Sequence, residues 1–282
     1  MAKAAPVTLC GSLSLHPVSL GARMHTAGYQ ALGLPYVYVP FAVELEQLSG
    51  ALAGMRALGI RGFGVSMPFK LAILPLLDRI EPQAERIGAV NTVVNDGGVL
   101  TGYNTDAAGA QRALEEVVPL SGRRAVVIGA GGAARAVASA LIDAGVRLHL
   151  ANRTPERAAS LAQALAAARP GLSAPPTFGG LSELPDLGQV QVLVNCSSAG
   201  MADYGPASPV PEGLLHPGLT VMDIVYKPIR TELLRAAARV GARTVHGGRM
   251  LLHQAARQFE LYTGHPAPLE AMDRALQAAL AG

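Results

Sequence analysis

The sequence is short of charge and of cysteine, and both shortages restrict what the protein can be. Of its 282 residues 15% are charged, the formal net charge is +3, and no run of lysine or arginine occurs. Without a basic cluster to neutralise phosphates, nucleic acid is not an expected partner. The two cysteines, Cys10 and Cys196, lie in apolar, strand-like contexts without metal-ligand spacing. We therefore expect buried thiols in a reducing cytoplasm, with no disulfide and no metal site.

Long apolar runs, internal repeats and flexible linkers are also missing. No hydrophobic stretch approaches membrane-spanning length, and the first residues lack the apolar core of a signal peptide. We therefore expect a cytoplasmic protein that does not bind a membrane. What is present is typical of a globular α/β protein, because half of the residues are hydrophobic and 32 are glycine. The length suits two domains of ordinary size.

The most informative pattern is a glycine-rich turn between two apolar segments. The run Ala125–Ile128 predicts a strand buried on both faces of a parallel sheet, and it ends in Gly129-Ala130-Gly131-Gly132. Helical spacing follows from Ala133 until Gly145, and a second strand is expected over 146–151. Glycines let the backbone turn tightly beneath a pyrophosphate, whose charge is stabilised by the helix N-terminus. A Gly-rich turn without a ligand is the weaker interpretation, because all four parts come in the required order.

The residues after the second strand indicate which dinucleotide binds. An acidic residue there would bind the ribose hydroxyls of NAD and repel a 2′-phosphate. This sequence has no acid at that point but Asn152-Arg153-Thr154. The Arg153 guanidinium can face a phosphate and stack on adenine, and Thr154 can add a hydroxyl. Thr154 can also cap the next helix, with Pro155 at its first position, and the two roles are compatible. The pattern favours NADP(H) over NAD(H).

Strands and helices alternate along the rest of the chain, which predicts an α/β fold in two domains. We expect residues 1–105 and 247–282 to form the substrate-binding and catalytic domain, and 106–246 a Rossmann-type NADP-binding domain. The crossing lies in a helix that begins at Asn104-Thr105-Asp106 and reaches about Val118. A Rossmann-type half needs no further helices after residue 246, so the last two helices should pack back onto the first domain.

A nicotinamide domain joined to a second domain favours hydride transfer, and ketone reduction also needs a proton donor. Lys70 and Asp106 both stand where a strand ends and a helix begins. A lysine close to a carboxylate can be held in place and exchange a proton with an alcohol oxygen. Taken alone, a lysine in a first helical turn is more often a solvated charge, and an aspartate there is more often a cap.

Seven short motifs raise both residues above that background. They fall in this order along nearly the whole chain: Ser66-Met-Pro-Phe-Lys70, Gly88-Ala-Val-Asn91-Thr92, Gly102-Tyr-Asn-Thr-Asp106, Gly129-Ala-Gly-Gly-Ala133, Asn152-Arg-Thr154, Asp223-Ile-Val-Tyr226-Lys-Pro228 and Gly247-Gly-x-Met250-Leu-x-x-Gln254. Together they resemble the shikimate dehydrogenase family, which reduces 3-dehydroshikimate with NADPH by means of a Lys–Asp pair.

The resemblance implies a role for each matching position. Lys70 and Asp106 would be the catalytic pair. The implied substrate contacts are Ser66, Asn91, Tyr226 and Gln254. The implied cofactor contacts are Gly129, Ala130, Gly131, Gly132, Ala133, Asn152, Arg153, Thr154, Ile224 and Gly247.

Two departures from the family pattern fall on the substrate side. The family usually has Asn-Val-Thr before the proline, where this chain has Gly64-Val-Ser66. Its His-Ser-x-Ser-Pro signature is here His16-Pro-Val-Ser19-Leu, which keeps the second serine alone. Ser12 and Ser14 are the alternative pair for a substrate carboxylate. Within the family, the chain resembles the shikimate dehydrogenase-like branch rather than the biosynthetic core enzyme. The residues that indicate this are Leu9-Cys-Gly-Ser-Leu-Ser14, Arg56–Gly62 and Val65–Lys70.

Three functions are therefore compared. The favoured one is an NADP-dependent dehydrogenase acting on shikimate or a close cyclic hydroxy acid, working as a monomer or homodimer. The second is an NAD-using quinate/shikimate dehydrogenase, against which Arg153 argues. The third is an NADP-binding regulator without activity, against which the presence of both Lys70 and Asp106 argues, because a sensor needs neither.

Overall fold

The computed structural model describes residues 6–281, and these form two compact units. Unit 1 runs up to Thr105 and resumes at Gln254, and unit 2 is Asp106–His253. Two helices pass from one unit to the other, α5 (Thr105–Glu115) and α9 (Gly247–Thr263). The second division therefore lies inside α9, whereas the sequence interpretation placed it at the start of that helix.

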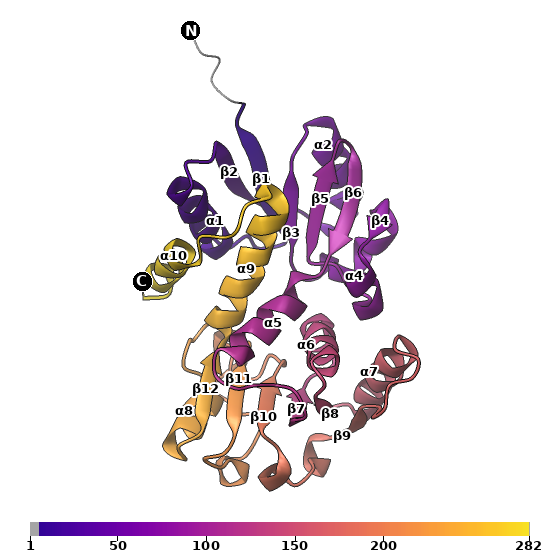
Figure 1. The fold of residues 1–282 in the computed structure, drawn as a ribbon, viewed down its shortest axis with the longest axis vertical. Helices are drawn as coiled ribbons and strands as arrows, with labels where there is room; N and C mark the ends of the chain where they lie inside the picture. Colours follow the sequence, from indigo (N-terminus) through magenta and orange to yellow (C-terminus); the bar gives the residue numbers. More distant parts are fainter. Residues whose placement is uncertain (1–5, 282) are drawn as a thin grey trace. The chain divides into compact units, whose positions relative to one another are not determined.

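Unit 1 contains a six-stranded sheet in the order β2-β1-β3-β5-β6-β4 (Figure 1). Strands β2, β1 and β3 are parallel, and the β5–β6 hairpin turns at Gly97-Gly98, both of which have positive φ. The elements before α5 are β1 (Thr8–Ser14), α1 (Leu20–Ala31), β2 (Tyr36–Ala42), α2 (Leu48–Ala57), β3 (Gly62–Val65), α3 (Phe69–Ala72), β4 (Arg79–Ile80), α4 (Pro82–Ile87), β5 (Thr92–Asp96) and β6 (Val99–Tyr103).

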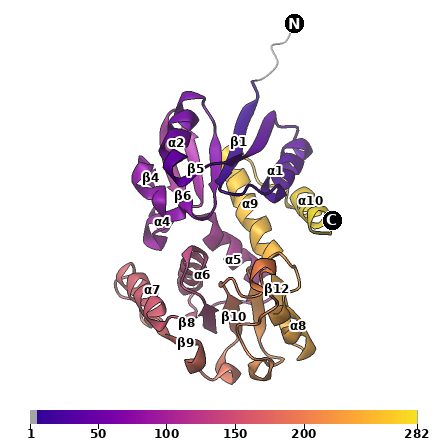
Figure 2. The ribbon, with the colours of Figure 1, turned by 180° about the vertical axis from the view of Figure 1, so that it is seen from behind.

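The two layers that cover this sheet differ in character. Aliphatic side chains of α2, such as Leu52 and Met55, pack with Phe63 and Val93 in one buried cluster. A second cluster is aromatic, because His25 of α1 stacks on Tyr38 with ring centroids 4.4 Å apart and also neighbours rings of α9. The last helix, α10 (Leu269–Ala281), packs along α1, as Figure 2 shows from behind.

Unit 2 contains a second six-stranded sheet in the order β12-β11-β10-β7-β8-β9, with every pair parallel. Its elements are β7 (Arg124–Ile128), α6 (Gly132–Asp143), β8 (Arg147–Asn152), α7 (Pro155–Ala167), β9 (Thr177–Gly180), β10 (Val192–Asn195), β11 (Thr220–Asp223), α8 (Glu232–Arg239) and β12 (Arg243–His246), before α9. Two buried clusters cover opposite faces of the sheet. The predicted α/β class with a Rossmann-type half is confirmed.

Strand β9 was not expected from the sequence. It is four residues long, stands at the sheet edge and carries the exposed Phe178. Its two glycines and the two prolines before it are typical of a loop. A short edge strand also needs no continuous apolar run, so the sequence does not predict it. Its parallel pairing with β8 defines it as a strand, although its side chains show no strand-like pattern.

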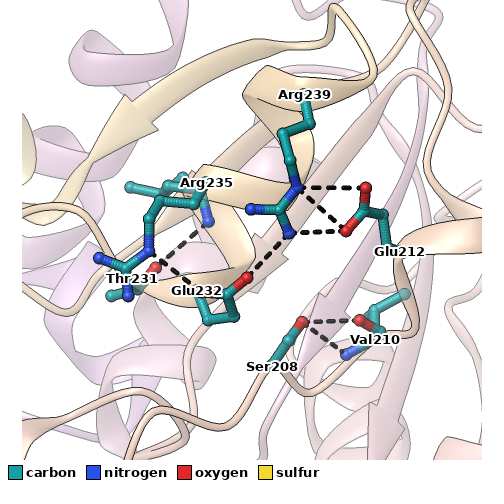
Figure 3. Close-up of polar contacts among 8 residues, drawn as sticks. Ser208, Val210, Glu212, Thr231, Glu232, Arg235 and Arg239 are labelled. Carbon is teal, nitrogen blue, oxygen red and sulfur yellow. Dashed lines mark hydrogen bonds and ion pairs between the residues drawn. The ribbon is translucent and has the colours of Figure 1, made fainter.

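Helix α8 is held by polar contacts at both of its ends. Thr231 caps it, since its Oγ1 accepts from the Leu234 N–H at 3.3 Å and donates to Asp223 on β11 at 2.7 Å. At the other end Arg239 bridges Glu212 and Glu232 (Figure 3). Among residues 6–281, no helix combines the length and apolar character that a membrane crossing requires.

Candidate active site

The predicted substrate residues of unit 1 gather at one edge of its sheet. Strand β3 and strand β6 each run antiparallel to β5, so their ends and the beginning of β5 lie together. The register places Gly64 opposite Thr92, and Thr92 opposite Tyr103. Ser66 and Asn91 lie just beyond this row of paired residues. The carboxyl ends of parallel strands are the usual place for a ligand in such sheets.

Asn91 is the centre of a buried amide cluster at that edge. Its side chain is 2% exposed. Its Oδ1 accepts from the Thr105 N–H at 2.7 Å and from the Thr92 hydroxyl at 2.9 Å. Its Nδ2 donates to the Thr105 hydroxyl at 3.0 Å and to Gln254 Oε1 at 3.1 Å. The fold thus brings together Asn91 and Gln254, two predicted substrate contacts that are far apart in the chain.

The candidate carboxylate-binding serines lie in two places. Ser12 pairs with Gly64 across the sheet, so Ser14 and Ser66, two residues further along, share a face at the same edge. Burial raises the pKa of Tyr38 well above its usual value, and a hydrogen bond with Ser12 acts against that rise. Ser19 is exposed at the beginning of α1 and makes no capping hydrogen bond.

The two predicted catalytic residues follow this cluster closely in the chain. Lys70 is half-buried in α3, and its carbonyl oxygen accepts from the Val90 N–H at 2.9 Å, next to Asn91. Asp106 is 5% exposed in the first turn of α5 and follows Thr105 directly. Asn91 thus binds the residue before Asp106, and its neighbour Val90 binds the backbone of Lys70. Their pairing stays a prediction, because Lys70 belongs to unit 1 and Asp106 begins unit 2.

The glycine turn of unit 2 has the form that a pyrophosphate requires. Gly129 has a φ of +115°, and a Cβ there would lie 2.9 Å from the carbonyl oxygen of Cys196, so a larger residue is excluded. Gly131 precedes α6 without a side-chain cap, and the first turn contains no acid. A Cβ on Gly131 would meet nothing within 4 Å. The open, uncapped N-terminus of this 12-residue helix fits a bound phosphate group.

Asn152 is the half-buried last residue of β8, and Arg153 and Thr154 follow it in an exposed turn. The Asn152 side chain shapes it by donating to the Thr154 carbonyl oxygen at 3.0 Å. Arg153 is exposed. Thr154 is the N-cap residue of α7 and Pro155 its first residue, as the capping interpretation expects, but the Thr154 hydroxyl makes no capping hydrogen bond. The hydroxyl therefore keeps the freedom to contact a ligand.

The remaining predicted cofactor contacts lie where α9 begins. A Cβ on Gly247 would come within 2.2 Å of the Ile224 carbonyl oxygen, so glycine is required for this close approach of two backbones. Ile224 is half-buried against the core. Tyr226, two residues further along, is also half-buried, and burial raises its pKa.

A buried carboxyl group that the sequence did not single out organises this end of the sheet. Asp223 Oδ1 accepts from Asn195 Nδ2 at 3.0 Å and from the Val225 N–H at 3.1 Å, and its Oδ2 accepts from Thr231. Burial raises the pKa of Asp223 to about 6, and the three hydrogen bonds act against that rise. The same carboxyl group adds to the effect of burial in raising the pKa of Cys196.

Sequence reasoning also passed over Thr92, Thr105 and Gln258, which surround Asn91. Thr92 and Thr105 stand inside two of the motifs, so they were quoted there without a role. Gln258 lies four residues after Gln254 and on the same face of α9. That spacing was a usable signal, because a second polar residue on the buried face of a helix needs a partner.

Comparison with known proteins identifies the family of the chain. Three family models match in succession: the shikimate dehydrogenase substrate-binding domain at residues 16–93, shikimate/quinate 5-dehydrogenase at 110–173, and the shikimate 5′-dehydrogenase C-terminal domain at 247–277. The chain belongs to the shikimate dehydrogenase family. The family resemblance drawn from the seven motifs is thus confirmed.

Individual shikimate dehydrogenases match over almost their whole length. A shikimate dehydrogenase (NADP⁺) of Moorella thermoacetica is 48% identical over 271 residues, covering 94% of this chain and 91% of the relative. A crystal structure of shikimate dehydrogenase in complex with NADP⁺ has a TM-score of 0.91 at 38% identity, covering 97% and 96%. The Thermus thermophilus enzyme in complex with NADP(H) and shikimate has a TM-score of 0.87 at 37% identity, covering 98% and 100%.

Proposed function

We propose that this chain catalyses the interconversion of shikimate and 3-dehydroshikimate with NADP(H), with Lys70 and Asp106 as its catalytic pair. The Asn91 cluster is the observation that carries the proposal. It fixes two amide side chains at the sheet edge and holds the residue before Asp106. The NADP⁺-dependent relatives at 48% identity support the same assignment.

NADP(H), when bound, supplies or accepts the hydride, and the side chains of this chain bind the substrate and move the proton. Asn91, Gln254, Ser66 and Tyr226 contact the ring substituents of the substrate. Lys70 and Asp106 exchange a proton with the oxygen at the reacting carbon, which is a hydroxyl in shikimate and a carbonyl in 3-dehydroshikimate. The two groups act as one coupled unit.

The substrate carboxylate is bound by serines at the beginning of unit 1. Ser14 shares a face with Ser66, which favours the pair Ser12 and Ser14 over Ser19. Hydroxyl donors suit a carboxylate because each can donate one hydrogen bond to an oxygen that only accepts.

The cofactor lies along the ends of β7, β8 and β11. Gly129, Ala130, Gly131, Gly132 and Ala133 place the pyrophosphate at the uncapped beginning of α6, where Gly131 leaves room for it. Asn152, Arg153 and Thr154 bind the 2′-phosphate side of the adenosine. Ile224 and Gly247 border the nicotinamide. Arg153 and its exposed position support the preference for NADP(H) over NAD(H).

Kinetics with the purified chain test the proposal directly. Shikimate and quinate are each supplied with NADP⁺ and with NAD⁺, and reduced coenzyme is followed at 340 nm. We expect the highest kcat/KM for shikimate with NADP⁺. A higher value for quinate with NAD⁺ would replace the proposed function, and no turnover by any pair would remove it.

The cellular setting and assembly complete the proposal. Both cysteines are buried and free, as expected, which agrees with a reducing cytoplasm. We propose a monomer or a homodimer, and light scattering on the eluted protein measures the mass against 29.0 kDa per chain.

A further inference from the structure

Gln258 extends the amide cluster by one step into the interior of unit 1. Its side chain is 5% exposed and lies one helical turn after Gln254 on α9. Its Nε2 donates to the Thr92 hydroxyl at 3.0 Å and approaches the Asn91 carbonyl oxygen at 3.4 Å. None of the seven motifs contains Gln258.

Hydrogen bonds connect Gln258 to Gln254 through Thr92 and Asn91. The Gln258 N–H occupies an acceptor site of the Thr92 hydroxyl, and the nearest acceptor for the Thr92 proton is Asn91 Oδ1 at 2.9 Å, with the Thr105 hydroxyl next at 3.3 Å. Asn91 Oδ1 accepts from Thr92 and from the Thr105 N–H, so its Nδ2 is the atom that donates to Gln254 Oε1. With its carbonyl oxygen bonded to Asn91, the Gln254 side chain directs its amide N–H groups away from Asn91. We call this series Gln258–Thr92–Asn91–Gln254 the amide relay.

The Gln258 side chain lies beside Gly64, Tyr38 and His25. A Cβ on Gly64 would lie 3.2 Å from Gln258 Nε2 and 3.1 Å from the Tyr38 hydroxyl, so the absent side chain leaves this space to both groups. The His25 imidazole also borders Gln258, and burial lowers the pKa of His25 to about 4. His25 is thus neutral near pH 7.

We propose that Gln258 is a positioning residue for substrate binding, which acts through Thr92 and Asn91 to turn the N–H groups of Gln254 toward the substrate. The ligand groups that it selects are acceptors, namely the hydroxyl or carboxylate oxygens of a small polyhydroxylated acid. This inference rests on the proposed function. It adds a structural link between Gly64, where the family usually has asparagine, and Gln258. Because glycine has no side chain, it leaves room for the amide relay.

Steady-state kinetics of Gln258→Met test the relay, with Gln277→Met on α10 as the matched control. Loss of one neutral hydrogen bond should raise the KM for shikimate about three- to tenfold. The KM for NADP⁺ and the kcat should stay within about twofold, because the hydrogen bonds of Gln258 Nε2 go to Thr92 and Asn91 and not to Lys70 or Asp106. A loss shared equally between the two substrates, or confined to kcat, would overturn the proposal.

A double-mutant cycle with Thr92→Val separates the relay from mere packing. If Gln258 acts through Thr92, adding Gln258→Met to Thr92→Val should change the KM for shikimate less than twofold further. Independent, multiplying effects would contradict the relay. Both substitutions nearly keep the volume of the side chain, and the unfolding midpoint of each variant is measured to check that it folds.

Side-chain amide signals in ¹⁵N NMR spectra report on the relay without any substrate. The Gln254 signals are assigned by their loss in Gln254→Leu, and they should shift in Gln258→Met and in Thr92→Val but not in Gln277→Met. Unchanged Gln254 signals would overturn the relay even in an active enzyme. Shifted signals in a protein that does not oxidise shikimate would support the relay and overturn the proposed function alone.

Discussion

The Thr105 N–H donates to Asn91 Oδ1 at 2.7 Å, and Asn91 Nδ2 donates to the Thr105 hydroxyl at 3.0 Å. The pair joins the beginning of β5 to the beginning of α5. Thr105 is 1% exposed, so both bonds are shielded from water. These bonds therefore fix the position of the backbone directly before Asp106.

Replacing Asn91 should weaken unit 1 and substrate binding together. In Asn91→Ala the buried Thr105 N–H and the Thr92 hydroxyl lose their acceptor, which costs about 1–3 kcal/mol of unfolding free energy. Urea unfolding measures this loss, and Asn152→Ala at the half-buried end of β8 is the control. A change below about 0.5 kcal/mol would mean that water replaces the Asn91 amide.

Lys70→Ala should lower kcat by about 10²–10⁴ while NADPH binding remains, because general acid–base catalysis is lost. Asp106→Asn should be similarly impaired. The double variant should be hardly slower than either single variant, since members of one catalytic unit are not additive. Stopped-flow or steady-state rates and NADPH fluorescence titrations supply the two readouts. Multiplying losses, or a normal kcat in Lys70→Ala, would refute the pair.

Arg153→Ala should weaken NADPH binding by about ten- to a hundredfold and NADH binding far less. One charge-assisted contact with the 2′-phosphate corresponds to about 1.5–3 kcal/mol, and NADH has no such phosphate. Equilibrium titration with both coenzymes measures the difference, with Arg147→Ala, on β8 and exposed, as the control. Equal losses for the two coenzymes would remove Arg153 from the phosphate site.

Gly247→Ala should destabilise unit 2 and weaken coenzyme binding. A methyl group there would lie 2.2 Å from the Ile224 carbonyl oxygen, so the β11 end or the beginning of α9 must move. Gly50→Ala in α2 is the matched control, because a Cβ at that position meets nothing within 4 Å. Replacing a helical glycine by alanine is neutral or stabilising where the space is open. Thermal unfolding with and without NADPH distinguishes the two variants.

His25 should make the protein less stable in acid. Its pKa is about 4 when folded against an ordinary 6.5, because burial among Tyr29, Tyr38 and Tyr262 disfavours the cation. Between these values the unfolded chain binds more protons, so stability is complete above about pH 6.5 and falls as the pH decreases toward 4. The full difference is about 3 kcal/mol.

His25→Phe should flatten this part of the pH profile, since a phenyl ring keeps the stacking and does not titrate. The free energy of unfolding between about pH 4 and 7 is measured for the wild type, His25→Phe and the control His265→Gln. His265 is exposed, so its replacement should leave the slope as it is. A steep acid loss in His25→Phe would assign the effect to other groups.

The sequence by itself determined the two-part α/β organisation, the glycine turn and the family. These features are local, because apolar runs, glycines with positive φ and short motifs act within a few neighbouring residues. Ala125–Ile128 and Gly129 could therefore be interpreted without knowing what packs on them. The absence of an acid at the end of β8 could also be interpreted from the sequence, because Asn152, Arg153 and Thr154 are consecutive residues.

The tertiary structure alone decided which side chains support Asn91. Gln258 and Gln254 lie more than 160 residues from Asn91 in sequence and reach it because α9 packs on the sheet edge. Strand β9 and the role of the Asp223 carboxyl group were likewise decided by tertiary structure, because each depends on a partner elsewhere in the chain. Hydrogen-bond direction and burial depend on such distant neighbours, and a linear pattern contains no information about which of them will meet.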